Sequence, residues 1–356
     1  MPERVLVAMS GGVDSSVAAA RLVKQGFDVV GVTLHLWDYP DDGTVKGRCC
    51  APEDVHDARR VADFLGIPHY SFDRRGLFQK EVIDPFVESY LEGETPSPCV
   101  RCNRGVKIRE LLTLAQRLEA ASVATGHYAR IGGPPECPTL LRAVDGDKDQ
   151  SYFLHMLSPD VLGRLRFPLG AATKAEVRAE AEQLGLPGAS KGESQELCFV
   201  PTGRYDAFVT ERADSRVRPG PIVDASGRVV GEHDGIHRFT RGQRKNLGVS
   251  LGYRAYVLDI QAQTGRVTVG PREALGARAA RLADVSLRGD ESLPLECEVA
   301  VRYRARPVPA LLTPVEGGVR LELRESVPAV VPGQYAVFYR GEEVLGGGVI
   351  QATEAS

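Results

Sequence analysis

The sequence lacks any apolar stretch long enough to span a membrane, and its first residues lack the apolar core of a signal peptide. It also lacks internal repeats and low-complexity tracts. Hydrophobic residues at 43% and charged residues at 26% are typical of a globular protein and exclude disordered and fibrous classes. We therefore expect a cytoplasmic protein without membrane contact. Because 356 residues exceed what one hydrophobic core usually supports, we expect two or three domains.

The sequence also lacks an even number of cysteines and an excess of basic residues. Seven cysteines are an odd number, and cytosolic thiols stay mostly reduced, so the count does not predict a disulfide framework. The odd number therefore favours reactive or metal-binding roles for these thiols over disulfide bonds. The formal net charge of -3 argues against a protein that coats nucleic acid by bulk electrostatics, and we expect no DNA partner.

The first part of the chain alternates strand and helix patterns. Apolar or β-branched runs predict strands over 4–9, 28–36, 68–72 and 122–125, and amphipathic stretches predict helices over 14–25, 52–65 and 78–91. This alternation predicts an α/β domain, 1–204, with a doubly wound parallel sheet. Its ligand site should lie at the carboxyl ends of the strands, where Gly11 and Gly126 fall.

Beyond about residue 205 the helical periodicity fades. Short β runs appear there between turn signals such as 225–228 and 263–266. The pattern predicts two small β-rich domains, 205–276 and 277–356, separated near 277–295. The last one is patterned like a β-barrel.

A glycine-rich loop, Ser10-Gly11-Gly12-Val13-Asp14-Ser15-Ser16, follows the first strand and opens the first helix. Glycines let backbone N–H groups approach phosphate oxygens, and a helix N-terminus favours negative charge. The loop has neither the Gly-Lys-Ser/Thr end of a Walker loop nor the spacing of a dinucleotide fingerprint, which disfavours those enzyme classes. A plain glycine turn with Asp14 and Ser15 capping the helix is the alternative.

A proline-punctuated loop, 94–103, carries a C-x2-C pair, Cys99 and Cys102, and leads into a basic helical stretch. A third thiol, Cys198, lies far along the chain. Thiolates are nucleophiles and metal ligands, so this pattern predicts a reactive site. The other cysteines are Cys49 and Cys50, whose roles stay open, and Cys137 and Cys297, which we expect to be inert.

Three stretches are locally basic: 101–109, 236–254 and 302–306. Each is suited to contact the phosphates of a nucleic acid. A solvated charged face is the alternative for any one of them.

Over essentially its whole length the chain resembles the bacterial tRNA-specific 2-thiouridylases, which belong to the PP-loop family of ATP pyrophosphatases, adenine nucleotide α-hydrolase-like in fold. The matching segments are 8–16, 49–50, 95–107, 124–128, 148–154, 198–199, 242–245, 302–304 and 332–334. The resemblance implies that ATP, with Mg²⁺, adenylates O2 of the wobble uridine, U34, in the anticodon stem-loop of tRNA. Sulfur would come from a cysteine desulfurase relay protein or from sulfide.

The resemblance also implies roles for individual residues. Cys198 would carry a persulfide that attacks C2 of the activated base, and Cys102 would release the product. The ATP contacts would be Ala8, Met9, Ser10, Gly11, Gly12, Val13, Asp14, Ser15, Leu34 and Gly126. The tRNA contacts would be Ser97, Pro98, Cys99, His127, Lys148, Asp149, Gln150, Arg302, Tyr303 and Gln334. A core position for His127 is the alternative.

One departure from the family pattern concerns Cys99, where many members carry Asp. Three thiols, Cys99, Cys102 and Cys198, leave two routes open: the persulfide pair, or a [4Fe-4S] cluster on all three. Three thiolates with an open fourth position suit such a cluster better than structural zinc, which wants a fourth protein ligand.

Two other function classes remain. One is another PP-loop enzyme, namely a 4-thiouridine synthase, an argininosuccinate synthase or an amidating synthetase. Amidating synthetases have no use for the cysteine loop, and the chain lacks the rhodanese-like and RNA-binding appendages of the 4-thiouridine enzyme. The other is a non-catalytic iron–sulfur RNA-binding protein, against which the intact loop 10–16 argues.

Overall fold

The computed structural model describes residues 2–38, 52–192, 197–200 and 203–355. The chain divides into two compact units. Unit 1 comprises residues 1–82, 99–203 and 342–344, and unit 2 comprises residues 83–98, 204–341 and 345–356. In the described part of the chain, no helix combines the length and apolar character needed to cross a membrane.

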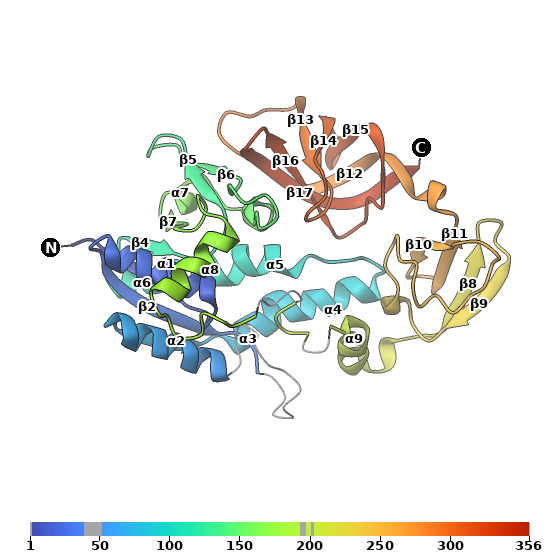
Figure 1. Cartoon of the computed structure of the whole chain (residues 1–356). Helices are drawn as coiled ribbons and strands as arrows, with labels where there is room; N and C mark the ends of the chain where they lie inside the picture. The colour runs from blue at the N-terminus through green and yellow to red at the C-terminus, as the bar shows by residue number, and fades with distance from the viewer. Residues whose placement is uncertain (1, 39–51, 193–196, 201–202, 356) are drawn as a thin grey trace. The chain divides into compact units, whose positions relative to one another are not determined.

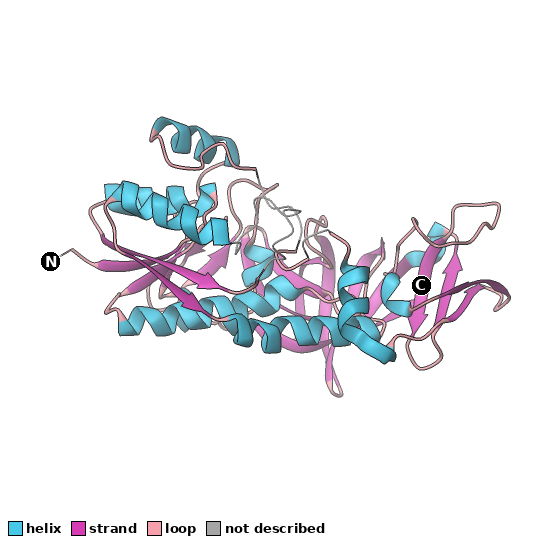
Figure 2. Cartoon of the chain, turned by 90° about the horizontal axis from the view of Figure 1, so that it is seen from below, coloured by secondary structure: helices cyan, strands magenta, loops and turns pink. Residues whose placement is uncertain are grey.

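Unit 1 is built on a five-stranded parallel sheet. Its strands, in spatial order, are β3 (His69–Asp73), β2 (Asp28–His35), β1 (Arg4–Ala8), β4 (Ser122–Ala124) and β7 (Leu165–Arg166). Helices lie on both faces of these strands (Figure 2). The predicted doubly wound α/β sheet is therefore confirmed. Chain connections diverge at β1, so the loops after β1 and β4 adjoin the point where such sheets bind ligands.

The core explains why these segments take their positions. Val5, Leu6 and Val7 of β1 are fully buried, as expected for a parallel strand covered on both faces. The main helices of unit 1 are α1 (Val13–Lys24), α2 (Pro52–Leu65), α6 (Ile108–Arg117) and α8 (Lys174–Gln183). Apolar residues of α1, among them Val17 and Ala18, pack with Val177 and Ala181 of α8.

Short elements complete unit 1. They are α7 (Pro159–Leu162), a 3-10 turn (Ser151–Leu154) and the hairpin of β5 (Arg130–Gly132) and β6 (Thr139–Leu141). Strand β6 also pairs with Glu343 and Val344.

Two segments wind differently from the prediction. The single helix expected over 78–91 is α3 (Arg75–Phe78), a π-helical turn (Gln79–Ile83) and α4 (Asp84–Leu91). The loop predicted over 94–103 is confirmed only for 94–97, and the rest of the cysteine segment is helical. It forms α5 (Pro98–Arg101) and a π-helical turn (Cys102–Lys107) that runs on into α6. Proline is well suited to the first position of a helix, because its missing N–H has no partner there anyway.

Unit 2 begins with α4 and continues with α9 (Tyr205–Ala213), a helix within the region predicted to be β-rich. The two helices pack through aromatic rings: Tyr90 stacks on Tyr205 with ring centroids 4.8 Å apart. A four-stranded sheet follows, with strands in the order β10 (Tyr256–Gln261), β11 (Arg266–Gly270), β8 (Gly220–Asp224) and β9 (Val229–His233). Its core contains Ile222, Val257 and Val267.

The last part of unit 2 is a closed barrel (Figure 1). Its strands are β12 (Gly276–Leu287), β15 (Gly318–Pro328), β14 (Val308–Val315), β13 (Leu295–Ala300), β16 (Tyr335–Arg340) and β17 (Glu343–Ala355). Pairing between β12 and β17 closes the six strands, so the predicted C-terminal β-barrel is confirmed. Most of 277–295, the region expected to separate two β-rich modules, is strand β12, whose pairing with β15 and β17 the barrel requires.

Candidate functional site

The loop between β1 and α1 has the geometry of a phosphate cradle. Gly11 has a φ of +71°, and a Cβ there would lie 2.4 Å from the carbonyl oxygen of Asp54, so only glycine fits. The N-cap of α1 is Gly12, whose carbonyl oxygen accepts hydrogen bonds from the hydroxyls of Ser15 and Ser16, each at 3.0 Å. The first N–H groups of α1 thus have no capping side chain, an arrangement that binds anions.

The predicted apolar nucleotide contacts lie beside this loop, at or just beyond the carboxyl ends of β1 and β2. Ala8 is the last residue of β1, and Met9 and Leu34 are buried. The N–H of Met9 donates to the carbonyl oxygen of Val32 at 2.8 Å, and the hydroxyl of Thr33 donates to the carbonyl oxygen of Met9 at 2.7 Å. These bonds fix the backbone from which the loop departs.

The carboxylate of Asp14 is held by two side chains from distant segments. Its Oδ1 accepts a hydrogen bond from the hydroxyl of Tyr128 at 2.8 Å and pairs with Nζ of Lys174 at 2.6 Å. Lys174 is the first residue of α8, and its side chain is only 12% exposed. The nucleotide loop is therefore tied to a lysine 160 positions later in the sequence.

A second ion pair ties the same two helices further along. Nη2 of Arg21 on α1 lies 2.6 Å from Oε2 of Glu180 on α8. The starts of the helices meet at Asp14 and Lys174, and later turns meet at Arg21 and Glu180. Helices α1 and α8 consequently run in the same direction.

Two predicted tRNA contacts, Asp149 and Gln150, take part in hydrogen bonds within unit 1. Asp149 accepts from the N–H of Ser151 at 3.1 Å and from its hydroxyl at 2.9 Å. Oε1 of Gln150 accepts from the N–H of Tyr128 at 3.0 Å, and the N–H of Gln150 donates to the carbonyl oxygen of Tyr128 at 2.8 Å. Gln150 thus fixes the backbone of Tyr128, and the hydroxyl of Tyr128 donates to Asp14. The neighbouring Lys148 is half-buried.

Gly126 and His127 follow β4 at the same end of the sheet. A Cβ on Gly126 would lie 2.9 Å from the backbone nitrogen of Ser15, so glycine allows this close approach to the nucleotide loop. Nδ1 of His127 lies 2.7 Å from Oγ1 of Thr125. Burial, together with the positive charge of Lys107, lowers the pKa of His127 to about 3, and its ring is neutral at physiological pH.

Cys99 and Cys102 lie on neighbouring turns of the helical segment. Burial raises the pKa of the Cys99 thiol to about 11, and the nearby Cys102 adds to this. Burial also raises the pKa of Cys102, while the charge and the backbone N–H of Lys107 lower it. Both groups are therefore thiols at neutral pH in this state. Lys107 acts electrostatically on Cys99, Cys102 and His127 alike.

The third predicted thiol, Cys198, is half-buried in a short turn. The next residue, Phe199, packs edge-on against Phe78 with ring centroids 5.7 Å apart. Among the residues that the structure describes, no three His, Cys, Asp or Glu side chains gather in a group able to hold a metal ion. The described residues thus do not bring Cys99, Cys102 and Cys198 together as a preformed ligand group. Cys49 and Cys50 lie outside the described residues.

The predicted RNA contact Gln334 belongs to unit 2, where it binds backbone ahead of the cysteines. Its Nε2 donates to the carbonyl oxygens of Thr95 at 2.8 Å and Pro96 at 3.3 Å. The N–H of Thr95 donates to the carbonyl oxygen of Pro332 at 3.0 Å. The turn around Gln334 therefore holds Thr95 and Pro96 by hydrogen bonds to their backbone, and the chain continues from there into Ser97 and Pro98.

The remaining predicted RNA contacts, Arg302 and Tyr303, lie in the turn between β13 and β14. Arg302, Arg304 and Arg306 are exposed. The guanidinium of Arg304 lies over the Tyr303 ring, 5.3 Å from its centroid. This turn presents positive charge and an aromatic face together.

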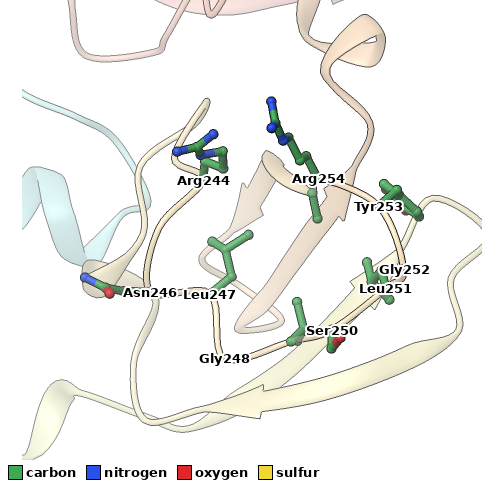
Figure 3. Close-up of a pocket in the computed structure, with 11 residues that line it drawn as sticks. Arg244, Asn246, Leu247, Gly248, Ser250, Leu251, Gly252, Tyr253 and Arg254 are labelled. Atoms are coloured by element: carbon green, nitrogen blue, oxygen red, sulfur yellow. The ribbon is translucent and has the colours of Figure 1, made fainter.

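The end of the basic stretch 236–254 surrounds a wide pocket of about 890 Å³, lined by Arg244 and residues 246–255. Figure 3 shows Arg244 and Arg254 on one side of this pocket and Leu247 between its walls. The backbone loops around the opening. Leu247 belongs to the core cluster of the four-stranded sheet, and Val249 and Leu251 pack against that cluster.

Sequence reasoning missed Tyr128 and Lys174 and did not single out Lys107. Lys107 and Tyr128 fall within the matching segments 95–107 and 124–128, but nothing in the sequence indicates a role for either side chain. Thr173 and Glu176 form a capping box, and such a box marks Lys174 as the start of a helix. No local pattern indicates which loop that helix start meets.

Three family models match the chain. A tRNA methyl transferase HUP domain matches residues 3–202, a tRNA methyl transferase PRC-barrel domain matches 206–271, and an aminomethyltransferase β-barrel domain matches 278–350. The first alone covers more than half of the chain.

Curated relatives are similar over nearly the whole length. A tRNA-specific 2-thiouridylase of Sorangium cellulosum is 61% identical, covering 98% of this chain and 92% of its own. Proteins of the same name from Nitrobacter hamburgensis and Heliobacterium modesticaldum are 49% and 47% identical, covering 98% of this chain and 90% and 93% of their own. A solved 4-thiouridine synthetase bound to RNA and ATP is 18% identical over 60% of this chain and 51% of its own, with a TM-score of 0.35, a likeness too low to bear on function.

Proposed function

Because the chain belongs to the tRNA-specific 2-thiouridylase family, we propose that it replaces O2 of the wobble uridine, U34, in tRNA by sulfur, using ATP to activate that oxygen. The matching family model is described as a tRNA methyl transferase domain, whereas the curated relatives are named for thiolation of tRNA, which supports sulfur transfer. We further propose a division into an ATP-binding and catalytic domain, 1–204, a small β-rich domain, 205–276, and a C-terminal barrel, 277–356.

One chain of contacts in unit 1 carries this proposal. Gly126 packs against the nucleotide loop at Ser15, and His127 follows it directly. Lys107 influences the pKa of His127 on one side and of Cys102 on the other. These links support a thiol close to the phosphate cradle, which is what adenylation followed by sulfur transfer requires.

The proposed first step uses ATP held at the loop by the N–H groups of α1, with Ala8, Met9, Leu34 and Gly126 beside it. O2 of uridine attacks the α-phosphate, an O–P bond forms and pyrophosphate leaves. Mg²⁺ accompanying ATP would offset the charge of the phosphates. Uridine O2 is a poor leaving group until it carries AMP, so this step makes the following substitution feasible.

The second step is proposed to run through a persulfide on Cys198. Its terminal sulfur attacks C2, the C2–O bond breaks, and AMP leaves with the electron pair. The thiolate of Cys102 then attacks Sγ of Cys198, which releases 2-thiouridine and leaves a Cys102–Cys198 disulfide. A thiol reductant must reduce that disulfide before the next turnover. A cysteine desulfurase relay protein would supply the sulfur as a persulfide. Sulfide would load Cys198 only in place of the thiol reductant, by attacking the Cys102–Cys198 disulfide at Sγ of Cys198 and releasing the Cys102 thiolate.

A [4Fe-4S] cluster on Cys99, Cys102 and Cys198 is the competing route, and we derive no step through it. Both routes require Cys198 to approach Cys102, so the lack of a three-thiol group among the described residues does not decide between them. Anaerobic purification separates the two. Iron and labile sulfide in stoichiometric amounts, lost in Cys99→Ser, would overturn the persulfide route. Full activity of iron-free protein with a persulfide donor supports it.

The proposed RNA contacts are Ser97, Pro98, Cys99, His127, Lys148, Asp149, Gln150, Arg302, Tyr303 and Gln334. The exposed arginines around Tyr303 suit phosphates and an unstacked base. The uridine is expected to be flipped out of the anticodon loop, because neither groove of a duplex exposes O2 to attack. The reaction is proposed to occur in the cytoplasm.

The deciding experiment digests tRNA after incubation with protein, Mg-ATP and a sulfur donor, and identifies its nucleosides by mass spectrometry. We expect 2-thiouridine at U34 with one AMP and one pyrophosphate per product. Cys102→Ser should abolish the product while ATP binding persists, and Cys137→Ser, at an exposed thiol, is the matched control. 4-Thiouridine as the product would refute the assignment, and normal product from Cys102→Ser would refute the role of that thiol.

A further inference from the structure

The nucleotide loop carries an acidic side chain but no basic one. Phosphate loops of the Walker type end in a lysine that reaches the phosphates, whereas residues 10–16 contain none. Asp14 adds a negative charge at the same place. Backbone N–H groups alone leave a bound pyrophosphate group without a positive side chain.

Helix α8 brings a lysine to this place. Nζ of Lys174 lies 2.6 Å from Oδ1 of Asp14, which is the second residue of α1. Its side chain is mostly buried, so solvent screens its charge less than that of a surface lysine.

Holding α1 against α8 does not by itself require Lys174. Arg21 and Glu180 already join α1 to α8, and Arg21 also donates to the carbonyl oxygen of Pro168 at 2.8 Å. Apolar residues of both helices share one core cluster. The position of Lys174 at the loop, rather than along the helices, is what distinguishes it.

The ammonium is also held in place from several sides. Tyr128 donates to the same oxygen of Asp14, and Nζ of Lys174 lies 5.9 Å from the centroid of the Tyr128 ring. Gln150 fixes the Tyr128 backbone through two hydrogen bonds. The N–H of Lys174 itself donates to Oδ2 of Asp145 at 2.8 Å.

We propose that Lys174 supplies the positive charge missing from the loop sequence and contacts the pyrophosphate part of ATP, while Tyr128 and Gln150 hold Asp14 beside it. This inference rests on the proposed function only in placing ATP at the loop. It assigns Lys174 to the phosphates and gives it no part in binding the adenosine.

The test measures binding of Mg-pyrophosphate and of AMP separately, by calorimetry on the full chain. Lys174→Met should weaken pyrophosphate about ten- to hundredfold, the range expected for losing a hydrogen bond to a charged group. AMP affinity should stay within about twofold, which also reports that the variant is folded. If Lys174→Met does not fold, Lys174→Gln removes the charge while its amide can still donate to Asp14.

Two control variants separate charge from packing. Arg21→Met breaks the other ion pair between α1 and α8 and should leave pyrophosphate affinity unchanged. Lys24→Met, at an exposed lysine near the far end of α1, should also leave it unchanged.

Equal losses for pyrophosphate and AMP in Lys174→Met, or an equal loss of pyrophosphate affinity in Arg21→Met, would overturn the inference. Wild-type protein that binds neither ligand would instead refute the proposed ATP site, and the inference with it.

Discussion

Replacing Gln334 by leucine tests whether this residue holds the cysteine segment or only contacts RNA. The substitution keeps the side-chain size but removes the donor to Thr95 and Pro96, leaving two carbonyl oxygens without it. Each such hydrogen bond contributes about 0.5–1.5 kcal/mol, and the contact to Pro96 is the longer one, so about 2 kcal/mol is at stake. If this energy positions the backbone leading to Cys99, kcat should fall about 30-fold.

The assay is steady-state thiolation with varied tRNA, supplemented by single turnovers with protein preloaded with persulfide. A positioning role lowers kcat and the single-turnover rate while KM for tRNA changes less than about threefold. The matched control is Gln351→Leu, at an exposed glutamine of β17. A large rise in KM for tRNA at unchanged kcat would refute the positioning role and leave Gln334 as an RNA contact alone.

Three further predictions follow from the site. Because burial raises the pKa of Cys102, its alkylation should accelerate about tenfold per pH unit between pH 7 and 8, and Lys107→Met should slow it at each pH; a rate already level at pH 7 would contradict this. Gly126→Ala places a Cβ 2.9 Å from the nitrogen of Ser15 and should raise KM for ATP in pyrophosphate release at least tenfold, whereas an unchanged KM would show that the loop yields. Thr173→Ala removes the cap of α8 and should lower the free energy of unfolding in urea by about 1 kcal/mol, and no loss would show that the cap is not stabilising.

The fold of unit 1 could be predicted from local patterns. A continuous apolar run predicts β1, helical periodicity predicts α1, and a β-branched run predicts β2, because each signal lies within one element. The two π-helical turns could not be predicted, since helical segments this short do not carry enough turns to reveal a one-residue shift in a 3.6-residue pattern. The helix beginning at Pro98 was hidden by prolines that read as loop signals.

The candidate site divides in the same way. The nucleotide loop is contiguous in sequence, so its pattern predicts its geometry. The ion pair between Asp14 and Lys174 depends on how α8 packs against α1, which no local pattern reports. Motif resemblance led to Gln150 as an RNA contact but could not indicate that it also clamps Tyr128, because that bond is set by tertiary structure.

The π-helical turn at Cys102–Lys107 makes the direction of the two thiols depend on a count of residues. A π-helical turn holds one residue more than an α-helical turn. Gly105 has open space where a Cβ would be, so a side chain there is tolerated. Deleting it would let the segment rewind as an α-helix and rotate Cys99 and Cys102 by about 100° relative to α6. Substitutions along this turn can therefore leave the thiols aimed as they are, while the loss of one residue would point both of them elsewhere.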